Sequence, residues 1–313
     1  MKKSLDIIII NWNSGDQLRE CLSTIKTDYE MFCVSKVIIV DNASCDNSLD
    51  NLESLNLPLE IIRNPHNAGF GAACNQGADK SNADYLLFLN PDTRLNGNSL
   101  EKPFLYMDDE INSKVGACSI KLVDETGMPG RTCTRLPRPG HFLVKILGLD
   151  HIFPGVFKSH FMTEWDHNDS RQVDHAIGAF YFVRRKVFVE AGKFDERFFV
   201  YLEDLDLSVR INKLGYKIYY LADVDAFHKG GGTSEKVKAT RLFYSVRSRI
   251  IYGFKHFNLL SAWLLLVATY TLEPLARFVL ALLHRSPREF GETAQGYKML
   301  VKDLPEILRR TYK

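Results

Sequence analysis

The chain has 313 residues, of which 45% are hydrophobic and 25% charged, enough for a catalytic core with an appendage. Its formal net charge is only +2, so the overall charge does not indicate a nucleic-acid partner. The six cysteines are scattered without a C-x-x-C pair, which predicts reduced thiols and excludes the usual disulfide and zinc frameworks. The first apolar run is interrupted by Asn11, so we expect no signal peptide.

Strand and helix patterns alternate along the first hundred residues. Short apolar runs predict strands at 5–10, 37–40, 59–62 and 85–89, and their continuity is typical of a buried parallel sheet. Helical patterns follow at 17–25, 46–55 and 67–78. Strands alternating with helices through short loops predict a βαβαβαβ nucleotide-binding half. A further strand at 115–123 is expected to leave this half.

Polar residues follow each of the four predicted strands. The clusters are Asn11 with Asn13, Asp41 with Asn42, Asn67 with Gly69, and Asn90 with Asp92. Any one of them is ordinary turn chemistry, because Asn, Asp and Gly dominate loops. Ligands of open α/β sheets bind beyond the carboxyl ends of the strands. Four clusters at one predicted edge therefore favour a shared site.

The phosphate-binding motifs of several other nucleotide-binding families are missing. No G-x-G-x-x-G follows the first strand, the Gly69-Phe70-Gly71 stretch is too short and too late, and there is no Walker A lysine motif. A nucleotidyltransferase usually has a glycine-rich loop with Lys or Arg after its first strand, where this chain has Asn11-Trp12-Asn13-Ser14. The nucleotide is therefore expected to be held differently from NAD or ATP.

The densest combination of aromatic and acidic side chains lies between residues 194 and 210. An apolar wall precedes the carboxylates of a predicted helix: Phe194, Phe198, Phe199 and Tyr201, then Glu203, Asp204 and Asp206. The first turn of a helix stabilises anions, and a carboxylate beside aromatic side chains has surroundings suited to a general base. From this stretch alone, an acidic turn that caps an ordinary amphipathic helix is an equally good interpretation.

Taken in order, these motifs resemble those of the inverting family-2 glycosyltransferases. The resemblance covers roughly residues 4–257 and rests on residues 7–13, 40–48, 67–71, 90–92 and 194–210. It implies the GT-A fold, a Rossmann-like mixed α/β sheet flanked by helices, and a nucleotide-diphosphate sugar as donor. We expect this catalytic domain over 1–257 and a helical appendage over 258–313. The pattern looks most like the bacterial rhamnosyltransferases that build cell-surface polysaccharide on lipid carriers.

The resemblance also implies roles for the residues that bind the nucleotide. Asp41 matches the aspartate that hydrogen-bonds the pyrimidine base, and Asp92 matches the metal-binding carboxylate of the D-x-D motif, in which Asn90 takes the first position. His228 matches a histidine that ligates the metal, Mg²⁺ or Mn²⁺. The remaining expected nucleotide-site residues are Asn11, Asn13, Asn42, Asn67, Gly69 and Asn75. The glycine run at 230–232 is expected to close over the diphosphate, and Ser234 to cap the next helix.

Other residues are expected at the reacting groups. Asp204 matches the catalytic base of the family. Gly178 interrupts a predicted strand at 173–183, where a ligand or backbone comes close, and in the family this segment lies under the acceptor sugar. Glu203 and Arg247 are expected contacts of the acceptor or the diphosphate.

The segment 259–283 is strongly apolar, but Glu273, Pro274 and Arg277 interrupt it. Its uninterrupted part falls short of the ~20 residues that a spanning helix needs. Residues 284–313 contain seven Lys or Arg against four Asp or Glu. An apolar helix beside a basic tail predicts peripheral attachment to the cytoplasmic face of the membrane. A helical hairpin buried against the core or in a homodimer interface is the alternative.

We expect an enzyme that transfers L-rhamnose from dTDP-rhamnose to a hydroxyl of a lipid-diphosphate-linked saccharide. Glucosyl, galactosyl or N-acetylglucosaminyl transfer from a UDP-sugar remains open, since the motifs do not define the sugar pocket. The alternative of another class is a catalytically silent membrane scaffold. The intact Asp41, Asp92, Asp204 and His228 argue against that loss of activity.

Overall fold

A computed structural model describes residues 2–153, 155–157, 159–230 and 237–311. The chain forms two compact units. The sheet unit consists of Met1–Thr134, Glu164–Glu196 and Glu203–Thr233, and the helical unit of Arg135–Thr163, Arg197–Leu202 and Ser234–Lys313. This division differs from the predicted boundary after residue 257, because the helix that ends at His256 packs with the helices that follow it. The predictions for residues 231–234 lie outside the described residues.

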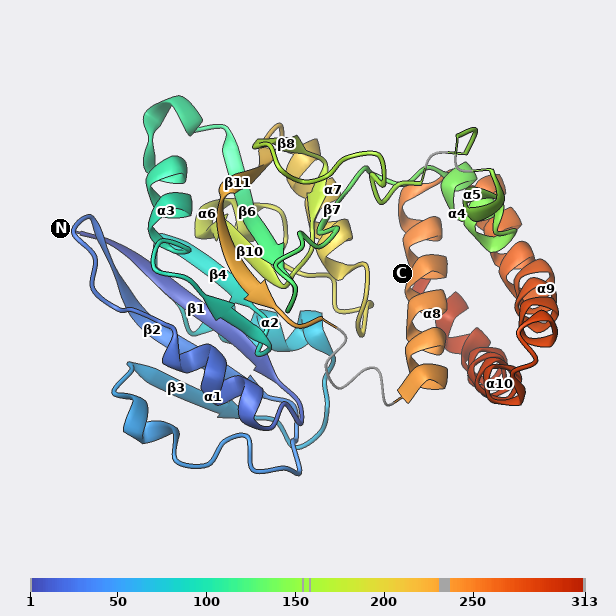
Figure 1. Ribbon diagram of the computed structural model, residues 1–313, viewed down its shortest axis with the longest axis horizontal. Coiled ribbons are helices and arrows are strands. Elements are labelled where there is room, and N and C mark those ends of the chain that lie inside the picture. Colours follow the sequence, from blue (N-terminus) through green and yellow to red (C-terminus); the bar gives the residue numbers. More distant parts are fainter. Residues whose placement is uncertain (1, 154, 158, 231–236, 312–313) are drawn as a thin grey trace. The chain divides into compact units, whose positions relative to one another are not determined.

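The sheet unit begins with four parallel strands, in the order β3-β2-β1-β4 (Figure 1). Their bounds are β1 Lys3–Asn11, β2 Phe32–Asp41, β3 Leu59–Arg63 and β4 Tyr85–Leu89. The four strands predicted from apolar runs are therefore confirmed. β4 has its predicted bounds, β3 is longer at its carboxyl end, and β1 and β2 are longer at both ends. Their carboxyl ends all lie at one edge of the sheet, as parallel pairing requires.

The sheet continues past β4 with β10, β6, β11 and β5, and it becomes mixed there. The further strands are β5 Thr93–Leu95, β6 Val115–Val123, β8 Arg171–Val173, β10 Phe180–Arg184 and β11 Lys217–His228. β10 is antiparallel to both β4 and β6, and β8 pairs with β11. The strand predicted at 115–123 forms β6, which lies beyond β10 in the mixed part of the sheet and outside the four parallel strands. Two short strands, β7 Cys133–Thr134 and β9 His175–Ala176, form a separate pair.

Helices cover both faces of the sheet. Ile7 and Ile9 of β1 pack in one core cluster with Leu18 of α1 (Asp16–Ser23) and Phe104 of α3 (Glu101–Asp108). On the opposite face lie α2 (Phe70–Asp79), α6 (Arg185–Glu190) and α7 (Glu203–Lys213). α2 approaches β1 so closely that a Cβ on Gly77 would lie 2.6 Å from Ile8, which is why this helix needs glycine there.

The helix predicted at 46–55 is largely absent, and only a 3₁₀ turn, η1 Leu52–Leu55, forms. The carboxylate of Asp46 accepts hydrogen bonds from the backbone N–H and hydroxyl of Ser48 and from the N–H of Gly15. Side chains that bond the local backbone compete with helix formation, and here they win. A second 3₁₀ turn, η2 Glu110–Asn112, follows α3.

The helical unit contains α4 (Pro139–Ile146), α5 (Leu149–Ile152), α8 (Lys238–His256), α9 (Leu259–Leu283) and α10 (Pro287–Thr311). α8, α9 and α10 share an apolar cluster that includes Phe243, Leu266 and Leu300. A buried ion pair joins Arg249 of α8 to Glu273 of α9. The predicted mixed sheet flanked by helices, with a C-terminal helical region, is therefore confirmed. None of the six cysteines forms a disulfide.

Candidate active site

Asp41 ends β2 and lies buried at the carboxyl edge of the sheet. Its Oδ1 accepts a hydrogen bond from Nδ2 of Asn11 at 2.7 Å, and its Oδ2 accepts one from the N–H of Ser44 at 3.1 Å. The amide of Asn11 also lies 2.8 Å from Oγ of Ser48 and is itself fully buried. Asn11 therefore positions the carboxylate, and Asp41 keeps unused lone pairs for a ligand.

Asn13 joins the loops that follow β1 and β2. Its N–H donates to Oγ of Ser44 at 2.9 Å, and its Oδ1 accepts from the N–H of Cys45 at 2.8 Å. Its backbone is left-handed, with φ 52°, a conformation that Asn tolerates better than most residues. These bonds hold the loops after β1 and β2 together beside Asp41.

Asn42, Asn67 and Gly69 shape the turn that begins α2. Nδ2 of Asn42 donates to the carbonyl of Gly69 at 3.1 Å, and Oδ1 of Asn67 accepts from the N–H of Gly69 at 2.9 Å. Gly69 has φ 88°, which an L side chain would strain. Oδ1 of Asn42 also accepts from Nδ2 of Asn64 at 2.9 Å, a residue that the sequence motifs did not single out.

Asn75 differs from the other predicted nucleotide-site residues. It is buried on α2, where Nδ2 donates to the carbonyl of Phe194 and to Oε1 of Glu196, both at 2.9 Å. Its Oδ1 accepts from the N–H of Phe194 at 3.0 Å. The amide is thus tied to the segment that leads towards α7, and its contacts do not join it to the cluster around Asp41.

Asp92 and His228 are brought together by the pairing of β5 with the end of β11, in which Thr93 is opposite His228. Nε2 of His228 lies 3.3 Å from Oδ1 of Asp92 and 3.5 Å from Nδ2 of Asn90. A carboxylate oxygen and an imidazole nitrogen side by side fit a divalent cation. Among the described residues, no group of three or more His, Cys, Asp or Glu has the arrangement of a metal site. Further ligands would therefore come from the substrate and water.

Asp204 lies in the first turn of α7 with its carboxylate held on both oxygens. Oδ2 accepts from the N–H of Gly178 at 2.8 Å, and Oδ1 accepts from its neighbour Leu205 at 2.7 Å. Nε2 of His175 lies 3.5 Å from Oδ1. Burial acts to raise the pKa of Asp204, but His175 and the two backbone donors outweigh it, so the pKa lies below its usual range.

A backbone hydrogen bond links the segment that holds Asp204 to the segment of Asp92. The N–H of Asn90 donates to the carbonyl of Ala179 at 3.0 Å, directly after the glycine that holds Asp204. A Cβ on Gly178 would lie 3.3 Å from Phe70 and 3.6 Å from Oδ2 of Asp204. Gly178 therefore lies against the carboxylate itself, and the carboxyl end of β4, the beginning of β10 and the first turn of α7 lie at one edge of the sheet.

Glu203 directly precedes Asp204, and its pKa is shifted in the opposite direction. It is buried, and its Oε2 has no hydrogen-bond partner among the described residues. Burial, together with the charges of Asp204 and Asp206, raises the pKa of Glu203 well above its usual range. Two adjacent carboxyl groups whose pKa values are pushed apart can take different roles, and the ionised member here is Asp204.

Arg247 is engaged by the protein itself. It is buried in α8 of the helical unit, where Nε donates to Oδ2 of Asp303 at 2.7 Å and Nη1 donates to the carbonyl of Arg197 at 3.0 Å. Ser248 donates to the carbonyl of Val200 at 2.8 Å, so α8 holds the segment 197–202 that precedes Glu203. This placement does not support the expected phosphate contact of Arg247, since its bonds anchor that segment.

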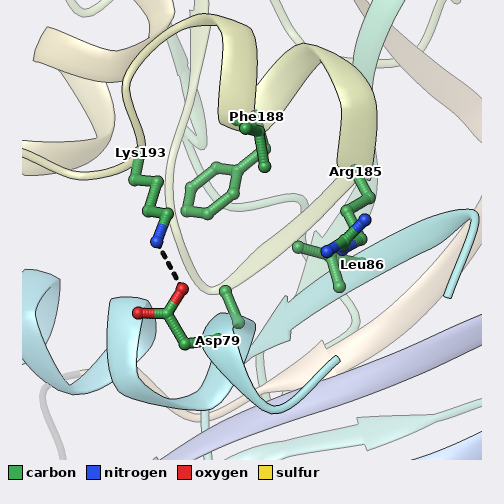
Figure 2. A pocket seen from close by; sticks show the side chains of 7 residues that line it. Asp79, Leu86, Arg185, Phe188 and Lys193 are labelled. Atoms are coloured by element: carbon green, nitrogen blue, oxygen red, sulfur yellow. Dashed lines mark hydrogen bonds and ion pairs between the residues drawn. The ribbon is translucent and has the colours of Figure 1, made fainter. Parts of the chain in front are cut away.

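A separate small cavity of about 180 Å³ lies between α2, α6 and the beginning of β4 (Figure 2). Its lining includes Leu86, Phe188 and the ion pair of Asp79 with Lys193. Leu86 lies near the amino end of β4, away from the strand end that leads to Asp92. None of the residues predicted for the site lines this cavity.

The sheet has the Asp204 carboxylate and the Asp92–His228 pair at its carboxyl edge, and its fold is that of the GT-A glycosyltransferases. The family model "Glycosyl transferase family 2" matches residues 6–190, which is more than half of the chain. The chain belongs to glycosyltransferase family 2 and is a glycosyltransferase enzyme.

Similar proteins agree with this assignment. The low-salt glycan biosynthesis hexosyltransferase Agl10 of Haloferax volcanii is 26% identical over 73% of this chain and 68% of its own. The N-acetylglucosaminyl-diphospho-decaprenol L-rhamnosyltransferase of Mycobacterium tuberculosis is 23% identical over 80% of this chain and 84% of its own. The structure of mannosyltransferase PcManGT from Pyrobaculum calidifontis, with GDP-Man and Mn²⁺, covers 100% of this chain and 86% of its own, with a TM-score of 0.55 and 15% identity. That last likeness supports the fold.

Proposed function

We propose that this enzyme is an inverting transferase that moves L-rhamnose from dTDP-rhamnose to a hydroxyl of a lipid-diphosphate-linked saccharide in cell-surface polysaccharide synthesis. The observation that carries the proposal is the hydrogen-bonded carboxylate of Asp204, connected through Gly178, Ala179 and Asn90 to the Asp92–His228 pair. The transferred sugar and the class of acceptor are supported by the name of the M. tuberculosis relative, an N-acetylglucosaminyl-diphospho-decaprenol L-rhamnosyltransferase.

In this mechanism Asp204 accepts the proton of the acceptor hydroxyl. The hydroxyl oxygen attacks the anomeric carbon from the face opposite the diphosphate. The bond from that carbon to the diphosphate oxygen breaks, and its electron pair leaves with the nucleotide diphosphate. Asp92 and His228 would hold Mg²⁺ or Mn²⁺, and the cation, when bound, neutralises charge on the leaving diphosphate.

The test is release of nucleotide diphosphate from a panel of dTDP-rhamnose, UDP-sugars and GDP-sugars. Each donor is assayed with and without a short lipid-diphosphate N-acetylglucosamine, in Mg²⁺, Mn²⁺ or EDTA. Acceptor-dependent release from dTDP-rhamnose is the expected result. Release from UDP-glucose, UDP-galactose or UDP-N-acetylglucosamine instead would support the alternative donor class. Nucleotide binding without release from any donor would support the silent scaffold, and no nucleotide binding would contradict the transferase proposal.

Replacing Asp41 with asparagine is expected to weaken binding of dTDP and UDP about tenfold or more, with turnover at saturating donor nearly unchanged. A hydrogen bond to a charged group contributes about 1.5–3 kcal/mol, and Asp41 is proposed to accept one from the ring N–H of the base. Calorimetric titration with dTDP, UDP and CDP measures the change. A lower turnover with unaltered affinity would contradict this role. Asp50→Asn, in the turn before η1, is the control.

We further propose that α9 attaches the enzyme to the cytoplasmic face of the membrane. Among the described helices, α9 is the one long and apolar enough to cross a bilayer. It presents a row of apolar side chains, each more than half exposed, at helical spacing: Leu260, Leu264, Val267, Leu275 and Leu282. Its opposite side contains the buried Glu273, paired with Arg249 of α8 and with Arg277. A helix tied to its neighbour by buried charges, beside the exposed basic residues of α10, suits the surface of an anionic leaflet.

Replacing Leu264 and Leu275 together with glutamate is expected to lower binding to anionic phospholipid vesicles by more than about tenfold. Burial of one leucine contributes about 1.5 kcal/mol or more, and the added charges are repelled by the lipid. Co-sedimentation with phosphatidylglycerol vesicles measures the loss. Ile111→Glu, at a residue that is 89% exposed in the sheet unit, is the matched control. If the double variant instead separates a homodimer and binds vesicles normally, α9 is an interface between copies.

A further inference from the structure

The short pair of strands β7 and β9 places a histidine beside the base. Thr134 is opposite His175 in this pair, and both side chains are buried in the sheet unit. Oγ1 of Thr134 lies 2.9 Å from Nδ1 of His175, and Nε2 of the same ring lies 3.5 Å from Oδ1 of Asp204. The three side chains form a row that ends on the carboxylate. Neither Thr134 nor His175 was among the residues predicted from sequence.

The contacts of the ring determine which nitrogen bears a hydrogen. Nε2 of His175 has no hydrogen-bond partner among the described residues, and it faces the negative oxygen of Asp204. A bare lone pair in that position would be repelled by the carboxylate. The hydroxyl of Thr134 can donate to Nδ1, and a ring hydrogen then lies on Nε2. His175 therefore presents an N–H towards Asp204, at a distance that a small closure would convert into a hydrogen bond.

The donors around Asp204 also define which oxygen is free to react. Oδ1 receives the N–H of Leu205 and faces His175, which accounts for both of its lone pairs. Oδ2 receives the N–H of Gly178 and keeps one lone pair. We propose that His175, oriented by Thr134, is a positioning residue that holds the Asp204 carboxylate so that Oδ2 receives the acceptor proton. This inference rests on the proposed function.

Other charged and titratable groups surround Asp204, and a substitution of His175 does not change these residues. They are Glu203 and Asp206 on α7, Tyr181 on β10 and Cys74 on α2. Tyr181 donates or accepts a hydrogen bond with Ser208 at 3.2 Å, one turn after the base. Because these groups stay in place, a change in the titration of Asp204 in the variant reports the loss of His175.

The test compares His175→Leu, His175→Gln and Thr134→Val. Leucine removes the N–H at similar volume, and turnover is expected to fall about 10- to 100-fold, as for a displaced catalytic group. The acid limb of the pH–rate profile is expected to move to higher pH, since a donor that favours the ionised carboxylate is lost. Glutamine can place an amide N–H near the position of Nε2, so it is expected to restore most of the turnover. Thr134→Val is expected to show an intermediate loss that is not additive with His175→Leu.

A merely structural histidine would give a different pattern, with lower thermal stability in all three variants and an unmoved pH–rate profile. That pattern, or wild-type turnover in His175→Leu, would overturn the proposal. If His175→Leu does not fold, the turnover of His175→Gln and the pH–rate profile of Thr134→Val test the proposal instead. An acid limb that does not move in Thr134→Val would also overturn it. A substrate-free titration of carbon-13-labelled aspartate carboxyl signals, with Asp204→Asn for assignment, separates the two proposals. An altered Asp204 titration in an enzyme that uses no donor on the panel would contradict the proposed function alone.

Discussion

Replacing Asp204 with asparagine is expected to lower sugar transfer about 10²–10⁴-fold, because an amide cannot take the proton of the acceptor hydroxyl. The hydrogen bonds and pKa shift that support an effect of this size belong to the side chain of Asp204. Two backbone N–H groups hold the Asp204 carboxylate, its pKa lies below the usual range, and burial raises the pKa of its neighbour Glu203 well above the usual range. Initial rates of acceptor-dependent release of nucleotide diphosphate measure the loss.

Two controls separate chemistry from folding in this variant. Asparagine keeps one carbonyl oxygen, so one of the two backbone donors loses its acceptor, at a cost of about 1 kcal/mol in unfolding free energy. Affinity for the nucleotide is expected to stay near that of the wild type, because the residues around Asp41 are unchanged. Asp79→Asn, on α2 at the cavity of Figure 2, removes a carboxylate of the same unit and is expected to leave turnover unchanged. Loss of both transfer and nucleotide binding in Asp204→Asn would identify Asp204 as structural.

Replacing Asp92 with asparagine is expected to lower turnover about 10²-fold or more and to remove its dependence on divalent metal. Asp92 is the carboxylate of the pair with His228, and charge stabilisation at a leaving group commonly accounts for an effect of this size. Nucleotide-diphosphate affinity is expected to rise with Mn²⁺ in the wild type and to be insensitive to Mn²⁺ in the variant. Calorimetric titration in Mn²⁺ and in EDTA measures both.

The binding data have an internal control. In EDTA, wild type and Asp92→Asn are expected to bind the nucleotide equally, since the contacts at Asp41 do not involve Asp92. His228→Asn is expected to show a smaller loss that is not additive with Asp92→Asn, because both side chains would hold one ion. A metal-stimulated rate that survives in Asp92→Asn would contradict the assignment of the metal to this pair.

Local patterns were sufficient for the parallel half of the sheet and for the polar clusters that follow its strands. Four apolar runs form β1 to β4, because a strand that is buried on both faces has apolar residues at consecutive positions. Polar residues after those strands met at one edge, because parallel strands all end there. The family motifs then pointed to Asp92, His228 and Asp204, and the structure joins the first two directly. The helix predicted at 46–55 is largely absent, because Asp46 accepts a hydrogen bond from Ser48 in a local turn.

Features that depend on distant pairing could not be predicted in this way. β6 belongs to the main sheet because β10, more than fifty residues later, lies between it and β4. Asn75 and Arg247 are polar residues whose partners, Phe194 and Asp303, are far along the chain. His175 had no signal beyond a polar residue in a short apolar strand, and its place beside Asp204 depends on the pairing of β7 with β9 and on α7. Side-chain type and spacing specify local conformation and candidate chemistry, whereas the contact between Asp204 and His175 arises from long-range packing.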